Sequence, residues 1–162
     1  YMLLGAWLLL ATVLTSLAVY DLRHMLLPNR MVLAATLTGA IYVFGVFMVG
    51  SGGIADDLTW WQPLSCAFGL SGLFWVMYQI SGGTWIGGGD VKLAVPLGLA
   101  VLKPEFAFML LLFASLFGTL YGLPLMILKK KSTKTRIPFG PMLITACGVV
   151  VLFGDRILDW YL

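Results

Sequence analysis

The sequence predicts an all-α membrane protein with six transmembrane helices, the fourth of them short, in one membrane-embedded domain over residues 1–162. Two observations carry this prediction. Hydrophobic residues make up 60% of the chain and charged residues 10%, with a mean hydropathy of +0.99; soluble domains have far more charge and far less apolar surface. In addition, the apolar residues are gathered into six uncharged runs, which leave no room for a separate soluble domain.

The six runs account for the expected helices in order. Five of them hold at least 18 residues, close to the roughly 20 needed to cross the hydrocarbon core. The fourth holds ten residues, and at about 1.5 Å per residue it covers only about half of a core about 30 Å thick. In chain order the runs are Tyr1–Tyr20, Met31–Gly50, Pro63–Ile80, Leu93–Leu102, Phe106–Leu128 and Ile137–Gly154.

The distribution of basic residues indicates that the short fourth run also crosses. With six crossings and the N-terminus outside, only Lys103 and Arg156 of the ten basic residues lie outside. If the fourth run turned back, the basic segment from Lys129 to Arg136 would move outside too. Because basic residues favour the cytoplasmic side, six crossings are the better interpretation. Small residues at four-residue spacing, such as Ala94 with Gly98, also predict close helix packing.

Two of the seven acidic residues, Asp21 and Asp90, fall on the inner side in this topology. Both adjoin apolar helices, where an isolated charge is costly and an ionisable residue indicates function. A carboxylate pair can hydrolyse a peptide, because like charges held close do not both ionise easily: one carboxylate activates water while the other keeps a proton for the carbonyl. The remaining acids belong to outer loops and helix ends: Asp56, Asp57, Glu105, Asp155 and Asp159.

Neighbouring residues fit such a site. Gly87, Gly88 and Gly89 give the backbone before Asp90 access to positive φ and to close approach, while Pro28 and Asn29 indicate a turn before the second helix. The sequence shows no spacing of His, Cys, Asp and Glu typical of a metal site, and no cofactor is expected. Further residues have ordinary explanations: Cys66 and Cys147 pack as small apolar groups, His24 is a solvated loop residue, and Trp60, Trp61 and Trp160 form an interfacial belt.

Three motifs together resemble the type IV prepilin peptidase family, the membrane aspartic proteases of bacteria. They are D-x6-P-N from Asp21 to Asn29, G-x-G-D-x-K-L from Gly87 to Leu93, and I-P-F-G-P from Ile137 to Pro141. The resemblance implies that Asp21 and Asp90 are the catalytic pair. It also implies that Lys92, Pro28 and Asn29, with the three glycines, shape the site or bind substrate, and that a loop containing Pro138, Gly140 and Pro141 supports it.

The resemblance also implies partners and a location. The expected substrates are type IV prepilins or type II secretion pseudopilins, whose basic leader would be cleaved at the cytoplasmic face of the bacterial inner membrane. The lipid bilayer is the other partner; no nucleic acid is expected, and the oligomeric state stays open. Longer family members carry an N-terminal segment with paired CxxC motifs that is associated with methylation, and nothing here matches it. The expectation is therefore peptidase activity without methyl transfer, unless such a segment precedes this sequence in a longer chain.

Two alternatives remain open at this stage. Asp21 and Asp90 could form the proton relay of a small transporter, since acids within a membrane also mark ion pathways. Both acids lie on one side, however, and no acidic partner continues the path. The second alternative is an intramembrane protease of the presenilin type, which shares the G-x-G-D aspartate and the Tyr20-Asp21 pair, but which has Pro-Ala-Leu where this chain has Ile137-Pro138-Phe139.

Overall fold

The apolar runs fold into six helices, and no strand occurs in the residues that the computed structural model describes, 2–49, 58–129 and 139–161. Five of the helices are long and apolar enough to span a membrane, and the fourth is short. The predicted fold class is therefore confirmed. The helices are α1 (Met2–His24), α2 (Asn29–Val49), α3 (Trp61–Ser81), α4 (Gly88–Val101), α5 (Pro104–Lys129) and α6 (Gly140–Tyr161).

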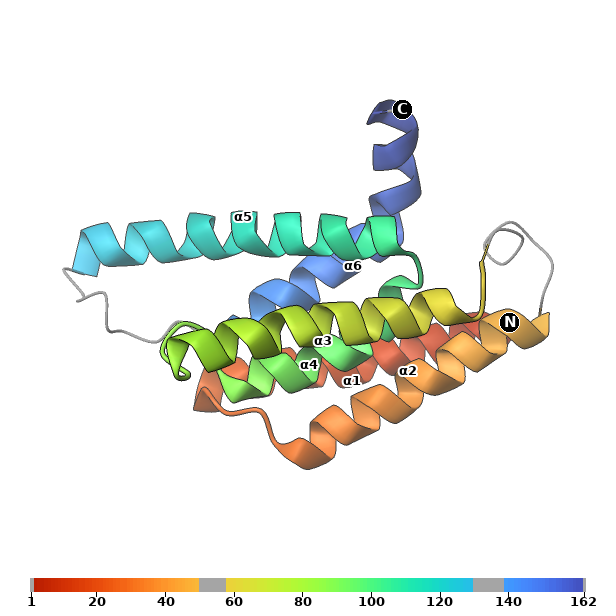
Figure 1. Ribbon diagram of the computed structural model, residues 1–162, viewed down its shortest axis with the longest axis horizontal. Coiled ribbons are helices and arrows are strands. Elements are labelled where there is room, and N and C mark those ends of the chain that lie inside the picture. The colour runs from red at the N-terminus through yellow and green to blue at the C-terminus, as the bar shows by residue number, and fades with distance from the viewer. Residues whose placement is uncertain (1, 50–57, 130–138, 162) are drawn as a thin grey trace.

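The short helix α4 occupies the middle of the bundle, where α3, α2 and α6 pack around it. From Leu93 to Val101 almost every side chain of α4 is buried, because its neighbours on all sides are other helices. Figure 1 shows α4 running back along α3, so that α5 begins at the opposite end of the bundle from the start of α4. The fourth helix thus runs from one end of the bundle to the other and does not turn back.

Small residues allow α4 to lie this close to its neighbours. A Cβ on Gly98 would stand 2.4 Å from the Cα of Ala67, so the backbones of α4 and α3 are in direct contact there. A Cβ on Gly39 of α2 would stand 3.3 Å from the Cβ of Leu99. The close packing expected from the small-residue spacing is confirmed at both positions.

One end of the bundle collects the C-termini of α1, α3 and α5 and the N-termini of α2, α4 and α6 (Figure 1). Arg23, Arg30 and Lys92 belong to this end by their places in α1, α2 and α4, while Lys103 and Arg156 belong to the other. The C-terminal part of α6 bends away from the bundle at that second end. Glu105, Asp155 and Asp159 are also there and are exposed, as expected for solvated helix ends. Asp56 and Asp57 lie outside the described residues.

Candidate functional site

Asp21 lies inside α1, not in the loop that follows it. The helix continues for one more turn, to His24, than the uncharged run suggested. This turn places the Asp21 side chain on the face of α1 that packs into the bundle, where only 5% of the residue is exposed. His24 is exposed and its ring stacks on Tyr20 with a centroid distance of 4.3 Å. The histidine is exposed, as expected, but it is the last residue of α1 and not a loop residue.

Asp90 comes from a different helix and lies in the first turn of α4. It is 8% exposed, and its backbone N–H donates a hydrogen bond to the carbonyl oxygen of Gly87 over 3.0 Å. The start of α4 is tied to α3 by the Ser71 hydroxyl, which donates to the carbonyl oxygen of Val91 over 3.1 Å. Asp21 and Asp90 are the only buried polar or charged side chains among the described residues.

Gly140, the first residue of α6, shows that the two carboxylates face the same place. A Cβ built on Gly140 would lie 2.7 Å from Oδ2 of Asp21 and 3.5 Å from Oδ1 of Asp90. One oxygen of each acid therefore lies within contact distance of a single point. The structure thus brings together two residues 69 positions apart in the sequence, and it adds the start of α6 as a third wall of the site.

Phe139 places Gly140 against the aspartates. Its ring meets Phe74 of α3 edge-on with a centroid distance of 6.3 Å, and a Cβ on Gly118 of α5 would stand 3.1 Å from its Cε2. Its carbonyl oxygen accepts a hydrogen bond from the N–H of Leu143, which closes the first turn of α6. Phe139 was not among the site residues predicted from the sequence. An aromatic residue between Pro138 and Gly140 was nevertheless an indication of a side chain that packs between helices and fixes the backbone there.

The supporting segment expected from the third motif is thus placed in part. Pro141 is buried in the first turn of α6, where the missing N–H of proline costs nothing. Pro138 lies outside the described residues. Gly140 was expected to support the site, and the structure places it beside both carboxylates, with no room for a side chain on the Asp21 side.

The residues of the first two motifs also meet. Nζ of Lys92 donates a hydrogen bond to Oδ1 of Asn29 over 2.8 Å. Asn29 is the first residue of α2, and the carbonyl oxygen of Pro28 accepts the N–H of Met31, so the pair ends the loop and starts the helix as expected. The loop from Met25 to Pro28 therefore reaches from the end of α1 to the start of α4.

The glycines before Asp90 serve close approach, and the expectation of positive φ is wrong. Gly87 is extended, with φ −73° and ψ 143°, while Gly88 and Gly89 are already helical. A Cβ on Gly89 would stand 2.8 Å from Cδ1 of Leu27, so this glycine admits the loop side chain. The positive φ values near the site belong instead to Gly82, Gly83 and Met25. Because α4 already begins at Gly88, Gly88 and Gly89 are helical. The turn that requires positive φ comes before them in the chain, at the end of α3.

Paired, buried carboxylates can divide acid and base work. Two carboxylates this close ionise together only at high electrostatic cost, so the pair tends to hold one proton.

The described residues contain no group of three or more His, Cys, Asp or Glu that could hold a metal ion. Cys66 and Cys147 are buried and free, and both lie in the packed core, as expected for small apolar residues.

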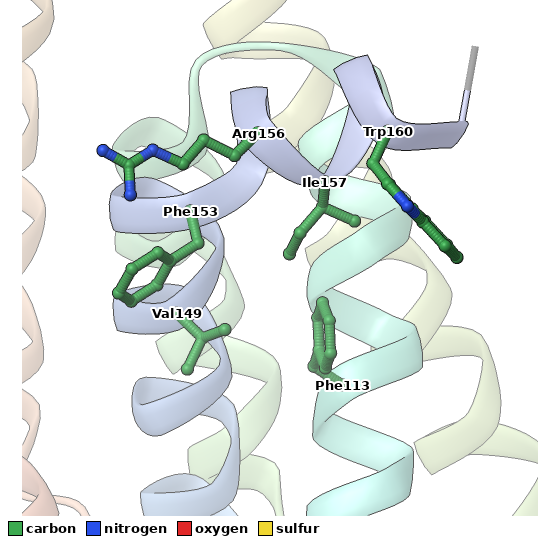
Figure 2. A pocket seen from close by; sticks show the side chains of 6 residues that line it. All are labelled: Phe113, Val149, Phe153, Arg156, Ile157 and Trp160. Carbon is green, nitrogen blue, oxygen red and sulfur yellow. The ribbon is translucent and has the colours of Figure 1, made fainter.

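A cavity of about 560 Å³ lies away from the aspartates, between α5 and the C-terminal part of α6. Figure 2 shows its apolar side chains turned toward one another, with the Arg156 guanidinium directed away from Ile157 and Trp160. No second polar group converges there, so this cavity lacks the means for acid–base chemistry. It is lined by Phe113, Val149, Phe153, Arg156, Ile157 and Trp160.

Comparison with known proteins agrees with the site. Residues 8–123 match the model of the type IV leader peptidase family. The chain belongs to this family. The match contains both aspartates of the site, and Gly140 lies beyond it. Family membership assigns the G-x-G-D motif to the type IV leader peptidase family and not to the presenilin type, which decides between the two family interpretations of the motifs.

Curated relatives extend the similarity over almost the whole chain. The chain is 34% identical to a prepilin leader peptidase/N-methyltransferase of Aeromonas salmonicida over 97% of its length, and 33% identical to one of Pseudomonas aeruginosa over 98%. A relative of that name from Bacillus subtilis is 28% identical over 93%. The chain spans about half the length of these relatives, 52%, 52% and 56% respectively. No solved structure matches.

Proposed function

We propose that this chain is an aspartic endopeptidase of the membrane that removes the basic leader from type IV prepilins or type II secretion pseudopilins. One observation carries the proposal: two buried carboxylates from α1 and α4 face one point beside Gly140. Membership in the type IV leader peptidase family and relatives named prepilin leader peptidases support the substrate class.

In the proposed reaction the aspartates act as one unit. The ionised carboxylate takes a proton from a water molecule while the water oxygen attacks the scissile carbonyl carbon. The protonated carboxyl group donates its proton to the carbonyl oxygen, so the tetrahedral intermediate forms without a localised negative charge. The C–N bond then breaks: the leaving nitrogen takes up a proton from one carboxyl group while a hydroxyl group of the intermediate gives its proton to the other carboxylate, so a carboxylic acid and an amine leave and the pair again holds one proton. Either acid can hold the first proton, because the two titrate together.

The proposed location follows from charge. The end of the bundle that holds the aspartates carries Arg23, Arg30 and Lys92 among its residues, and basic residues favour the cytoplasm. This supports a multi-pass protein of the bacterial inner membrane with its N-terminus outside and its site facing the cytoplasm. A pilin precursor could then keep its apolar helix in lipid while the leader junction reaches the end of the bundle.

Burial argues against the proton-transporter alternative. Among the described residues, no Asp, Glu, Lys, Arg or His other than Asp21 and Asp90 is buried, so no acidic or basic side chain continues a path from the pair toward the other end of the bundle. A relay across the membrane needs such a chain of groups. The two acids form a closed pair at one end, as hydrolysis requires.

Cleavage of a prepilin by the purified chain tests the proposal. Asp21→Asn and Asp90→Asn keep the size of each side chain and remove its charge, so each variant should lose cleavage while keeping the wild-type helical content by circular dichroism. Cleavage at the wild-type rate by either variant would remove that aspartate from the mechanism. A control is provided by Asp155→Asn, because Asp155 is exposed at the opposite end of the bundle.

A further inference from the structure

The two aspartates are carried by helices that have little contact with each other. Among the described residues, α4 packs chiefly on α3, α2 and α6, while α1 packs on α2 and α6. The separation of Asp21 and Asp90 is therefore set by structures that bridge α1 and α4. One bridge is the start of α6, where an oxygen of each carboxylate lies within 3.5 Å of the point that a Cβ on Gly140 would occupy.

The loop between α1 and α2 forms a second bridge. It leaves α1 at His24 and reaches α4 at two points: Leu27 packs on Gly89, where a Cβ would stand 2.8 Å from Cδ1, and Asn29 accepts the hydrogen bond from Lys92. Gly89 and Lys92 flank Asp90 in the sequence. The loop thus holds α4 on both sides of the aspartate, while its other end continues directly from the helix turn that carries Asp21.

Backbone strain at the start of the loop shows that the loop is held in place. Met25 has a φ of 51°, in the left-handed region that costs a non-glycine residue about 1 kcal/mol or more. Its N–H still donates to the carbonyl oxygen of Asp21 over 2.8 Å. A strained conformation persists only where surrounding contacts fix it, and the contacts of Leu27 and Asn29 with α4 are two that hold this loop.

From this geometry we propose that Asn29 and Lys92 form a positioning pair that sets the approach of Asp21 to Asp90. The proposal rests on the proposed peptidase function. Neither residue needs to touch the reacting atoms: their hydrogen bond fixes the loop, and the loop fixes the end of α1 relative to the start of α4. Near-attack geometry is sensitive to small displacements, since a shift of about 1 Å can cost on the order of 100-fold in rate.

The test removes the hydrogen bond from either side. Lys92→Met keeps the aliphatic stem without the donor, and Asn29→Ala removes the acceptor without changing charge. Each should lower kcat for prepilin cleavage on the order of 10-fold with little change in KM, and the double variant should be no worse than either single one. Lys92→Arg keeps a donor and Asn29→Asp keeps an acceptor, so each of these variants should retain most of the activity. The matched control is Arg30→Gln.

Arg30 suits this purpose because it is an exposed cation next to Asn29, and it makes no side-chain hydrogen bond or ion pair with any residue that the structure describes. A purely electrostatic role of Lys92 would leave Asn29→Ala fully active. A purely structural role would lower the thermal midpoint and the amount of folded enzyme, without a selective fall in kcat. Either result would overturn the proposal.

A second readout does not depend on cleavage. Hydrogen–deuterium exchange of the whole protein in lipid nanodiscs should be faster for the amides of residues 25–27 in Lys92→Met and in Asn29→Ala, and unchanged in Arg30→Gln. Equal exchange in all proteins would overturn the pair even if activity fell. Faster exchange with unchanged kcat would overturn its positioning role. If the wild-type protein cleaved no prepilin, the proposed function would fail, and the positioning role of Asn29 and Lys92 would fail with it. The exchange data would still decide whether the Asn29–Lys92 hydrogen bond holds the loop.

Discussion

Replacing Gly140 by alanine would press a methyl group against the aspartate pair. The added Cβ would stand 2.7 Å from Oδ2 of Asp21 and 3.5 Å from Oδ1 of Asp90. The second distance is an ordinary contact, whereas the first is a clash, so Asp21 has to move. To reach 3.4 Å the oxygen must retreat by about 0.7 Å, and the side chain is short and buried at 5% exposure, which leaves it little freedom.

This displacement gives the magnitude of the expected effect. A shift approaching 1 Å at a reacting group costs on the order of 10- to 100-fold in rate, which corresponds to about 1.4 to 2.7 kcal/mol of transition-state stabilisation. The fall should be in kcat, because the displaced group is one of the two carboxylates that act on the scissile bond in the proposed reaction. Folding should survive, since alanine is a better helix former than glycine by about 0.5 to 1 kcal/mol.

The assay is steady-state cleavage of a prepilin by the purified variants in detergent or nanodiscs, with thermal unfolding measured alongside. Gly148→Ala is the matched control: it lies on the same helix, and a Cβ there would meet nothing within 4 Å. Wild-type kcat in Gly140→Ala would refute the argument that this residue borders the reacting carboxylates. A fall of the same size in Gly148→Ala would show that the loss comes from α6 as a whole.

Two further predictions concern the bundle and the chemistry. Gly98→Ala should lower the thermal midpoint and cost about 1 to 3 kcal/mol, because its Cβ would meet the backbone of Ala67 at 2.4 Å; Gly72→Ala, which faces open space on α3, should not. Equal midpoints for both variants would contradict this direct backbone contact. Cleavage should continue at an unchanged rate after exhaustive treatment with EDTA, because a carboxylate pair needs no metal; inhibition that added metal reverses would contradict the two-aspartate mechanism.

The fold class could be predicted from the sequence because a membrane-spanning helix is recognisable from its composition. An uncharged run of about 20 residues has few alternatives in water or in lipid. The fourth run is helical and short, as expected, and its crossing of the membrane stays a prediction from the basic residues. The helix boundaries were less predictable. Asp21 marked the end of the first apolar run, yet α1 continues to His24, because a charged residue can remain helical when the helix leads it into a protein interior.

The two residues of the candidate pair could be predicted from the sequence, but the arrangement of their side chains in space could not. Nothing in the chain around Gly140 signals that its missing side chain makes room for two carboxylates more than 40 residues away in the sequence. The glycines before Asp90 were predicted only in part, for a related reason. Close approach was expected and is found at Gly89, but positive φ is not, and the sequence did not show that the approaching side chain is Leu27. Contacts between distant segments are the information that local pattern lacks.

The arrangement also explains why a membrane protein would put its chemistry at helix ends. A pair of acids in the middle of α1 and α4 would be shielded from water, and its separation would be fixed by helix packing alone. At the end of the bundle, water can reach the acids, and two short connections can fix their separation: Phe139–Gly140 from α6, and the loop that ends at Asn29. Changes in those connections can then adjust the site without disturbing the apolar core on which the fold depends.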